Sequence, residues 1–150
     1  MRWLALLLLS WSCSSSSDLV SRTVEGGPGQ PITVDIASVD NSVEVPDPDG
    51  SRQYTLQVEV GNSTDTLLTV TRISVRTDGG GAFQVYPTVQ KFNELLDPGK
   101  DHLFEIKTRG RFARQFRPDE SRTVVLLVIV ELSNGDSYSY TFEGPVKQTP

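Results

Sequence analysis

The chain has 150 residues, of which 22% are charged and 37% hydrophobic, so one folded domain is expected and wholesale disorder is excluded. One His, one Cys and one Met exclude a multi-His metal site, a cysteine-rich zinc module and an internal disulfide. The formal net charge of −5 argues against binding through overall basicity, so no nucleic-acid partner is expected.

The first twelve residues, MRWLALLLLSWS, are typical of a secretory signal peptide. Arg2 supplies the positively charged N-terminal region of such a peptide, and an apolar stretch runs from Trp3 to Trp11. This stretch is shorter than the roughly 20 residues that a membrane-spanning helix needs. We therefore expect residues 1–12 to direct export.

The only cysteine, Cys13, follows the small residue Ser12 at the expected cleavage point. This arrangement resembles the lipobox of bacterial lipoproteins, although Ser10 and Trp11 depart from its usual pattern. The resemblance implies a lipid on Cys13, a mature chain held by a membrane, and a place in the bacterial cell envelope, at the outer membrane or facing the periplasm. The alternative is an ordinary signal peptide cut near Ser12 or within the following serine run, which would give a secreted chain without a lipid.

Residues 13–30 predict a flexible tether between this cysteine and a folded domain. They begin with the serine run Ser14–Ser17 and continue into a segment rich in glycine and proline, which disfavours regular structure. The folded domain is expected to span residues 31–146, and residues 147–150 form a short tail.

From residue 31 onward the apolar residues recur with a period of two, which predicts strands. The phase changes near Thr71–Arg72, which indicates a bulge or a strand that changes sheets. Thr123–Leu132 is apolar in both phases and is expected to be a central strand covered on both sides. Asn134 and Gly135 then predict a hairpin turn into an alternating strand at Tyr138–Phe142.

These patterns predict an all-β protein, an antiparallel two-sheet sandwich of about seven strands. An up-and-down barrel is the alternative way to close the sheet. The stretch Val89–Leu96 is compatible with one helical turn.

Three segments resemble the bacterial immunoglobulin-like or fibronectin-III-like domains. LQVEVGNSTDTLLTVTRISV looks like their paired B and C strands, and Asp97–Lys100 and Arg117–Ser121 look like the turns that introduce their strands. The resemblance covers roughly residues 50–145 and implies an immunoglobulin-like sandwich. It does not extend to the antibody-type core, because the body lacks a cysteine pair and a tryptophan.

No catalytic residue or cofactor is expected. His102 is the only histidine, the chain has no G-x-S-x-G nucleophile motif, and no two carboxylates are marked as a pair. Asp47-Pro48-Asp49-Gly50, with Asp40 nearby, lacks the longer calcium-loop pattern and is interpreted as a turn, so no metal site is expected. Asn62-Ser63-Thr64 matches the glycosylation acceptor pattern but is expected to be an ordinary turn.

The basic segment 107–122 is the most unusual feature, since it gathers six positive charges in an acidic chain. A helical turn would put Phe112 and Phe116 on one face. In the alternative, a long connection, these phenylalanines fill the sandwich end and the arginines pair with Asp119 and Glu120. The candidate binding residues are Arg109, Arg111, Phe112, Arg114, Phe116 and Arg117.

The function expected from these features is a non-catalytic binding module, anchored by lipid, whose partner is an envelope protein or glycan. One alternative is a binder of the membrane surface or of an anionic polymer through residues 107–122. The other is an enzyme, or an accessory subunit of one, that acts on envelope glycans.

Overall fold

The structure is a computed structural model that describes residues 22–24, 29–40, 50–115, 117–120 and 122–145, and these residues form nine β-strands and no helix. The strands are β1 (Arg22–Val24), β2 (Ile32–Asp40), β3 (Arg52–Asn62), β4 (Leu68–Thr77), β5 (Phe83–Val85), β6 (Thr88–Leu96), β7 (Asp101–Phe112), β8 (Thr123–Leu132) and β9 (Ser137–Pro145). In the part of the chain that the structure describes, no helix is long and apolar enough to cross a membrane.

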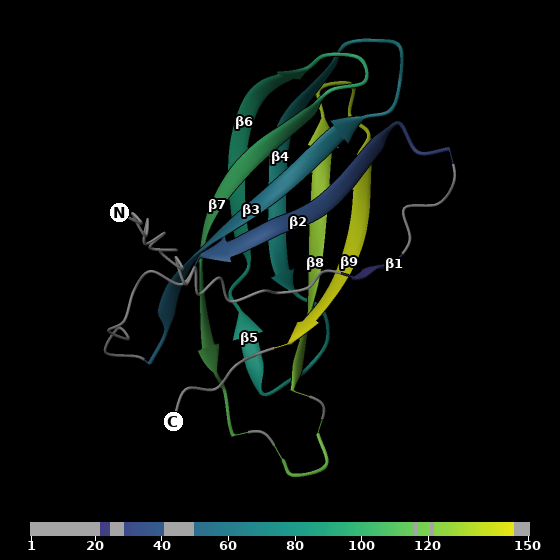
Figure 1. Cartoon of the computed structure of the whole chain (residues 1–150). Helices are drawn as coiled ribbons and strands as arrows, with labels where there is room; N and C mark the ends of the chain where they lie inside the picture. Colours follow the sequence, from purple (N-terminus) through teal and green to yellow (C-terminus); the bar gives the residue numbers. More distant parts are fainter. Residues whose placement is uncertain (1–21, 25–28, 41–49, 116, 121, 146–150) are drawn as a thin grey trace, which may run out of the picture.

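The strands form two antiparallel sheets that lie face to face (Figure 1). One has five strands in the order β1-β9-β8-β4-β6, and the other has four in the order β2-β3-β7-β5. This arrangement confirms the all-β, two-sheet sandwich, with two strands more than the approximate number expected. The extra strands are β1 and β6.

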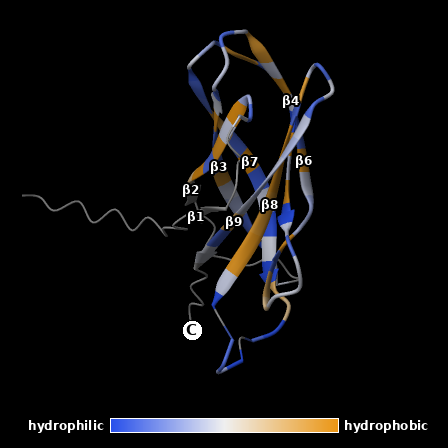
Figure 2. Cartoon of the chain, turned by 90° about the vertical axis from the view of Figure 1, so that its right-hand side faces the viewer, coloured by the Kyte–Doolittle hydropathy of each residue, from blue (hydrophilic) through white to orange (hydrophobic). Residues whose placement is uncertain are grey.

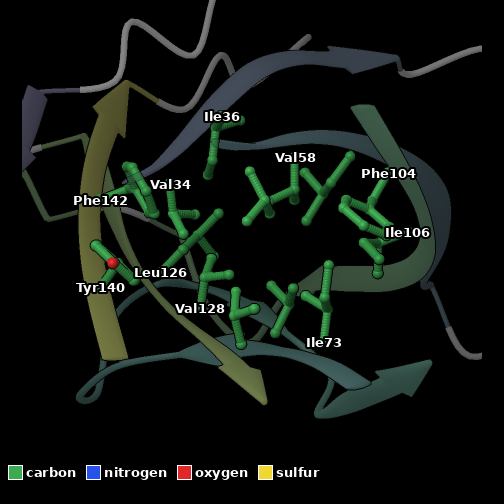
Figure 3. Packing of buried hydrophobic residues seen from close by; sticks show 14 of the residues in the cluster. Val34, Ile36, Val58, Ile73, Phe104, Ile106, Leu126, Val128, Tyr140 and Phe142 are labelled. Atoms are coloured by element: carbon green, nitrogen blue, oxygen red, sulfur yellow. The ribbon is translucent and has the colours of Figure 1, made fainter. Parts of the chain in front are cut away.

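The core lies between the two sheets, where alternate residues of the facing strands point inward (Figure 3). From β3 and β7 come Val58 and Ile106, and from the opposite sheet Ile73, Val128 and Phe142, all fully buried. Burying a side chain of this size contributes about 1.5–3 kcal/mol, so this layer is the main source of stability.

Strand β8 lies between β9 and β4 and is central, as its apolar sequence predicted. The expectation that both of its faces are covered is wrong. Its inward residues are buried, whereas Val125, Leu127 and Ile129 on the outer face are only half-buried. The reason is that no third layer packs on this face in the part of the chain that the structure describes. β8 is accordingly the long hydrophobic ribbon in Figure 2.

Two local predictions are confirmed. The register of β4 against both β6 and β8 shifts between Val70 and Arg72, which is the predicted bulge. The hairpin of β8 and β9 turns at Gly135, whose φ of +92° lies in the left-handed region that glycine adopts at little cost. The backbone N–H of Asp136 donates to Oδ1 of Asn134 at 3.0 Å and stabilises this turn.

Two other expectations are wrong. Val89–Leu96 holds no helical turn but forms most of β6, paired with β4, and Val89 and Leu95 remain 58% and 59% exposed. Arg22–Val24, within the segment expected as a tether, form β1 and pair with β9. The signal peptide, Cys13, and the turn at Asp47 and Asp49 lie outside the described residues.

Candidate functional site: a basic surface on the four-stranded sheet

Strand β7 carries the first half of the basic segment. Lys107, Arg109 and Arg111 are exposed, whereas the alternating residues Thr108 and Gly110 are buried toward the core. The segment as far as Phe112 is therefore a strand, so the long connection expected for the basic segment begins only after Phe112, and Phe112 itself is not in a helical turn. The spacing of two puts all three cations on the same face of the sheet, and we call Lys107, Arg109 and Arg111 the basic surface.

The neighbours of the basic surface across the sheet are polar and uncharged. Thr55 lies opposite Lys107 and Gln53 opposite Arg109, both from β3. Gln84 of β5 lies opposite Arg111. Because directly opposed residues share a face of the sheet, no carboxylate is placed directly opposite any of the three cations on these strands.

A shallow hollow of about 430 Å³ borders the basic surface. It lies where the chain leaves β5 and crosses to the other sheet through Tyr86 and Pro87. Its lining consists of Gln53, Tyr86, Pro87, Thr88, Lys107, Thr108 and Arg109. None of these lining residues is Asp or Glu, so the hollow does not supply the pair of carboxylates that a glycosidase uses.

Hydrogen bonds hold the wall of this hollow in place. The hydroxyls of Thr88 and Thr108 lie 2.7 Å apart, and Thr88 also donates to the backbone carbonyl of Tyr86 at 3.0 Å. The Tyr86 ring in turn lies 5.7 Å from the guanidinium carbon of Arg111, within the range of a cation–π contact. Arg111 is therefore oriented by an aromatic ring beside the hollow.

Phe112 belongs to the core and not to the exposed surface. It is half-buried and its ring meets that of Phe83 edge-on, with 5.0 Å between the ring centroids. Phe83 meets Tyr54 in the same way at 5.8 Å. Phe112 thus fills the end of the sandwich, as expected for it if the basic segment is a connection between strands. Phe116 lies outside the described residues.

Arg114, beyond the end of β7, is engaged within its own loop. Its guanidinium nitrogens bond both carboxylate oxygens of Glu120, each at 2.6 Å. The backbone N–H of Arg117 donates to the same carboxylate at 3.1 Å. The hydrogen bonds from Arg114 and then Arg117 lower the pKa of Glu120 to about 2. Arg117 is exposed, but it lies in this loop and not in the row on β7.

Two other residues singled out in the sequence, His102 and Asn62, make contacts within the fold. His102 Nδ1 lies 3.6 Å from a carboxylate oxygen of Glu94, and its ring packs edge-on against Phe104. The buried side chain of Asn62 donates to the carbonyls of Thr66 and Leu96, which ties two turns together. Within the described ranges, no three His, Cys, Asp or Glu residues are grouped to hold a metal ion.

A second charged area, not expected from the sequence, lies on the same sheet face. Asp35 of β2, Glu59 of β3, and Asp101 and Glu105 of β7 are all exposed. The register places Asp35 opposite Glu59, and Glu59 opposite Leu103. The four carboxylates therefore lie around the first half of β7, next to the half that carries the basic surface. We call these four residues the acidic surface.

The sequence matches no protein-family model and no curated protein. Similar folds occur among solved structures. A structural-genomics target designated SoR45 superposes with a TM-score of 0.51 at 8% identity, over 80% of this chain and 90% of that one. The putative ApaA protein of Bordetella pertussis gives 0.42 at 16% identity, over 79% and 95%. A FixG-related protein of Vibrio parahaemolyticus gives 0.39 at 16% identity, over 79% and 99%. At these identities the likeness concerns the fold alone.

Proposed function

We propose that this chain is an exported, lipid-anchored protein of the bacterial cell envelope whose β-sandwich is a non-catalytic docking module of immunoglobulin type. Residues 1–12 direct export, and the lipid on Cys13 holds the chain at a membrane. The sandwich then presents the basic surface to an acidic partner in the envelope.

One observation carries the docking proposal: three cations stand in a row on a rigid strand, with only uncharged residues directly opposite them on the neighbouring strands. A strand held in a sheet fixes its side chains more firmly than a loop does, so little ordering is needed on binding. The hollow beside the row offers hydrogen-bonding groups and the ring of Tyr86. Arginine in such a setting forms charge-assisted hydrogen bonds with carboxylates and phosphates.

The same cations support a second candidate, binding of an anionic membrane surface or polymer. That binding is driven by charge, so association with vesicles rich in anionic lipid falls steeply as salt rises. The acidic surface on the same sheet face opposes it, because a uniformly negative partner is repelled there. For this reason we place the protein partner first.

In-cell photo-crosslinking tests the docking proposal. A photo-reactive amino acid replaces Gln53 or Gln84, the neutral neighbours of Arg109 and Arg111, in the full chain. We expect one discrete protein adduct, which disappears when Lys107 and Arg111 are changed to Glu. The same probe at Glu143, exposed on the other sheet, is the matched control. Equal adducts from Glu143, or adducts that survive the charge reversal, would overturn docking through the basic surface.

A further inference from the structure

The outer face of the four-stranded sheet is divided into two halves of opposite charge. Along β7 the exposed residues run Asp101, Leu103 and Glu105, and then Lys107, Arg109 and Arg111. The register adds Asp35 and Glu59 to the first half, and Thr55, Gln53, Gln84 and, one strand further out, Asp40 to the second. Counted over these residues, the first half carries four negative charges, and the second carries three positive charges and the one negative charge of Asp40.

The outer ends of the two halves are far enough apart to act separately. Leu103 and Arg109, near their centres, are six residues apart on one strand, which corresponds to about 20 Å at 3.4 Å per residue. The Debye length is about 10 Å at 0.1 M salt, so the outer ends of the two halves are largely screened from each other, whereas Glu105 and Lys107, about 7 Å apart at the boundary, are not. Asp101 and Arg111, at the two ends of this run, therefore retain their attraction for an outside charge.

We infer that this face binds a second copy of the same chain, in an antiparallel, face-to-face dimer. A two-fold axis that lies between the two faces, perpendicular to β7 and level with the boundary between Glu105 and Lys107, places Asp101 and Glu105 of each copy against Arg111 and Lys107 of the other. An isologous interface requires a surface that is complementary to itself after such a rotation. The charge order along β7 meets this requirement, since reversing the strand exchanges the two signs.

The interface is expected to be weak and sensitive to salt. Exposed ion pairs contribute little individually, and Leu103 is the only large exposed hydrophobic residue on this face of the described sheet. Weak pairs become populated when their partners are concentrated. Anchoring at one membrane raises the effective concentration in this way. The inference rests on the proposed function in one respect: it identifies the acidic partner of the basic surface as a second copy.

Sedimentation of charge-swapped chains tests the dimer. All chains are full-length and carry Cys13→Ser, so that no lipid drives association. The acidic variant is Lys107→Glu with Arg111→Glu, and the basic variant is Asp101→Lys with Glu105→Lys. A control variant, Arg76→Glu with Glu143→Lys, changes charges on the other sheet. Thermal unfolding first establishes that all chains remain folded.

We expect the parent and the control to approach the mass of two chains at low salt and high concentration. Their association constant should fall at least about tenfold between 0.05 and 0.5 M salt. Each charge-swapped variant alone should remain monomeric. The equimolar mixture of the two should again form dimers, because a predominantly acidic strand β7 then meets a predominantly basic one.

A monomeric parent under all these conditions, or a mixture that fails to associate, would overturn the dimer. The proposed function has a separate readout in the crosslinking experiment. A discrete adduct with a different protein, combined with a monomeric parent in solution, would retain docking and reject the second copy as the partner. An adduct with the mass of two chains would support both.

Discussion

The hydroxyl of Tyr140, on β9, donates a 2.8 Å hydrogen bond to the backbone carbonyl of Ile32, at the start of β2 and 108 residues earlier. The two strands belong to different sheets, so this bond joins the layers of the sandwich at one side. Tyr140 is only 2% exposed and Ile32 1%, and no solvent replaces the bond if it is lost.

The change Tyr140→Phe removes this hydroxyl while it keeps the ring. We expect it to lower the free energy of unfolding by about 1–2 kcal/mol, because the buried carbonyl of Ile32 loses its partner. Urea denaturation measures the change. Tyr138→Phe is the matched control: its hydroxyl meets Asp136 at 3.3 Å in an exposed turn, so a similar loss there would contradict this explanation.

The same residue predicts a fall of stability in alkali. Burial raises the pKa of Tyr140 to about 12, above the ordinary value of 10 that it has when unfolded. Between these values the unfolded chain binds fewer protons than the folded one, so stability decreases as pH rises from 10 to 12 and is unaffected by this group below pH 10. Unfolding midpoints measured from pH 8 to 12 should fall less steeply in Tyr140→Phe. Parallel curves for the two proteins would contradict the prediction.

The loop after β7 contains an acid that should remain ionised far below its usual range. With the pKa of Glu120 at about 2, its bonds to Arg114 and Arg117 contribute stability that is present above pH 4.5 and lost as pH falls through 2. NMR titration of the side-chain carboxyl carbon measures this value directly. Arg114→Ala should return the pKa of Glu120 toward its ordinary value, whereas Arg76→Ala, on β4 and outside this loop, should leave it unchanged.

Gly110, between two arginines of the basic surface, points toward the core, where its missing side chain leaves room for Phe83. A Cβ there would lie 2.8 Å from Cζ of Phe83 and 3.1 Å from the carbonyl oxygen of Gln84. Phe83 is held between Tyr54 and Phe112 and cannot easily move. We expect Gly110→Ala to cost about 1–3 kcal/mol in calorimetry. Gly80→Ala, with nothing within 4 Å of its Cβ, is the control and should be nearly neutral.

The elements with a single dominant period could be predicted from the sequence. Thr123–Leu132, its Asn-Gly turn and the phase change at Thr71 each contain the signal that decides their structure locally. Val89–Leu96 does not, because its apolar residues at 89, 92, 95 and 96 are also spaced as on a helix. Pairing with β4 decides between the two, and this leaves Val89 and Leu95 exposed.

The candidate site could be predicted only in part. The concentration of arginines was visible, and the spacing of two between Lys107, Arg109 and Arg111 is itself a strand period. The helical spacing of Phe112 and Phe116 concealed it. The acidic surface could not be found at all, because Asp35, Glu59 and Glu105 meet only through the register of three strands distant in sequence.

Mass spectrometry of the mature product, expressed as the full chain in a bacterial host, tests most directly whether the protein is an anchored envelope module. We expect residues 1–12 to be absent and the new N-terminal Cys13 to carry the additional mass of a lipid. An intact chain beginning at Met1 in the cytosolic fraction would contradict export and anchoring together.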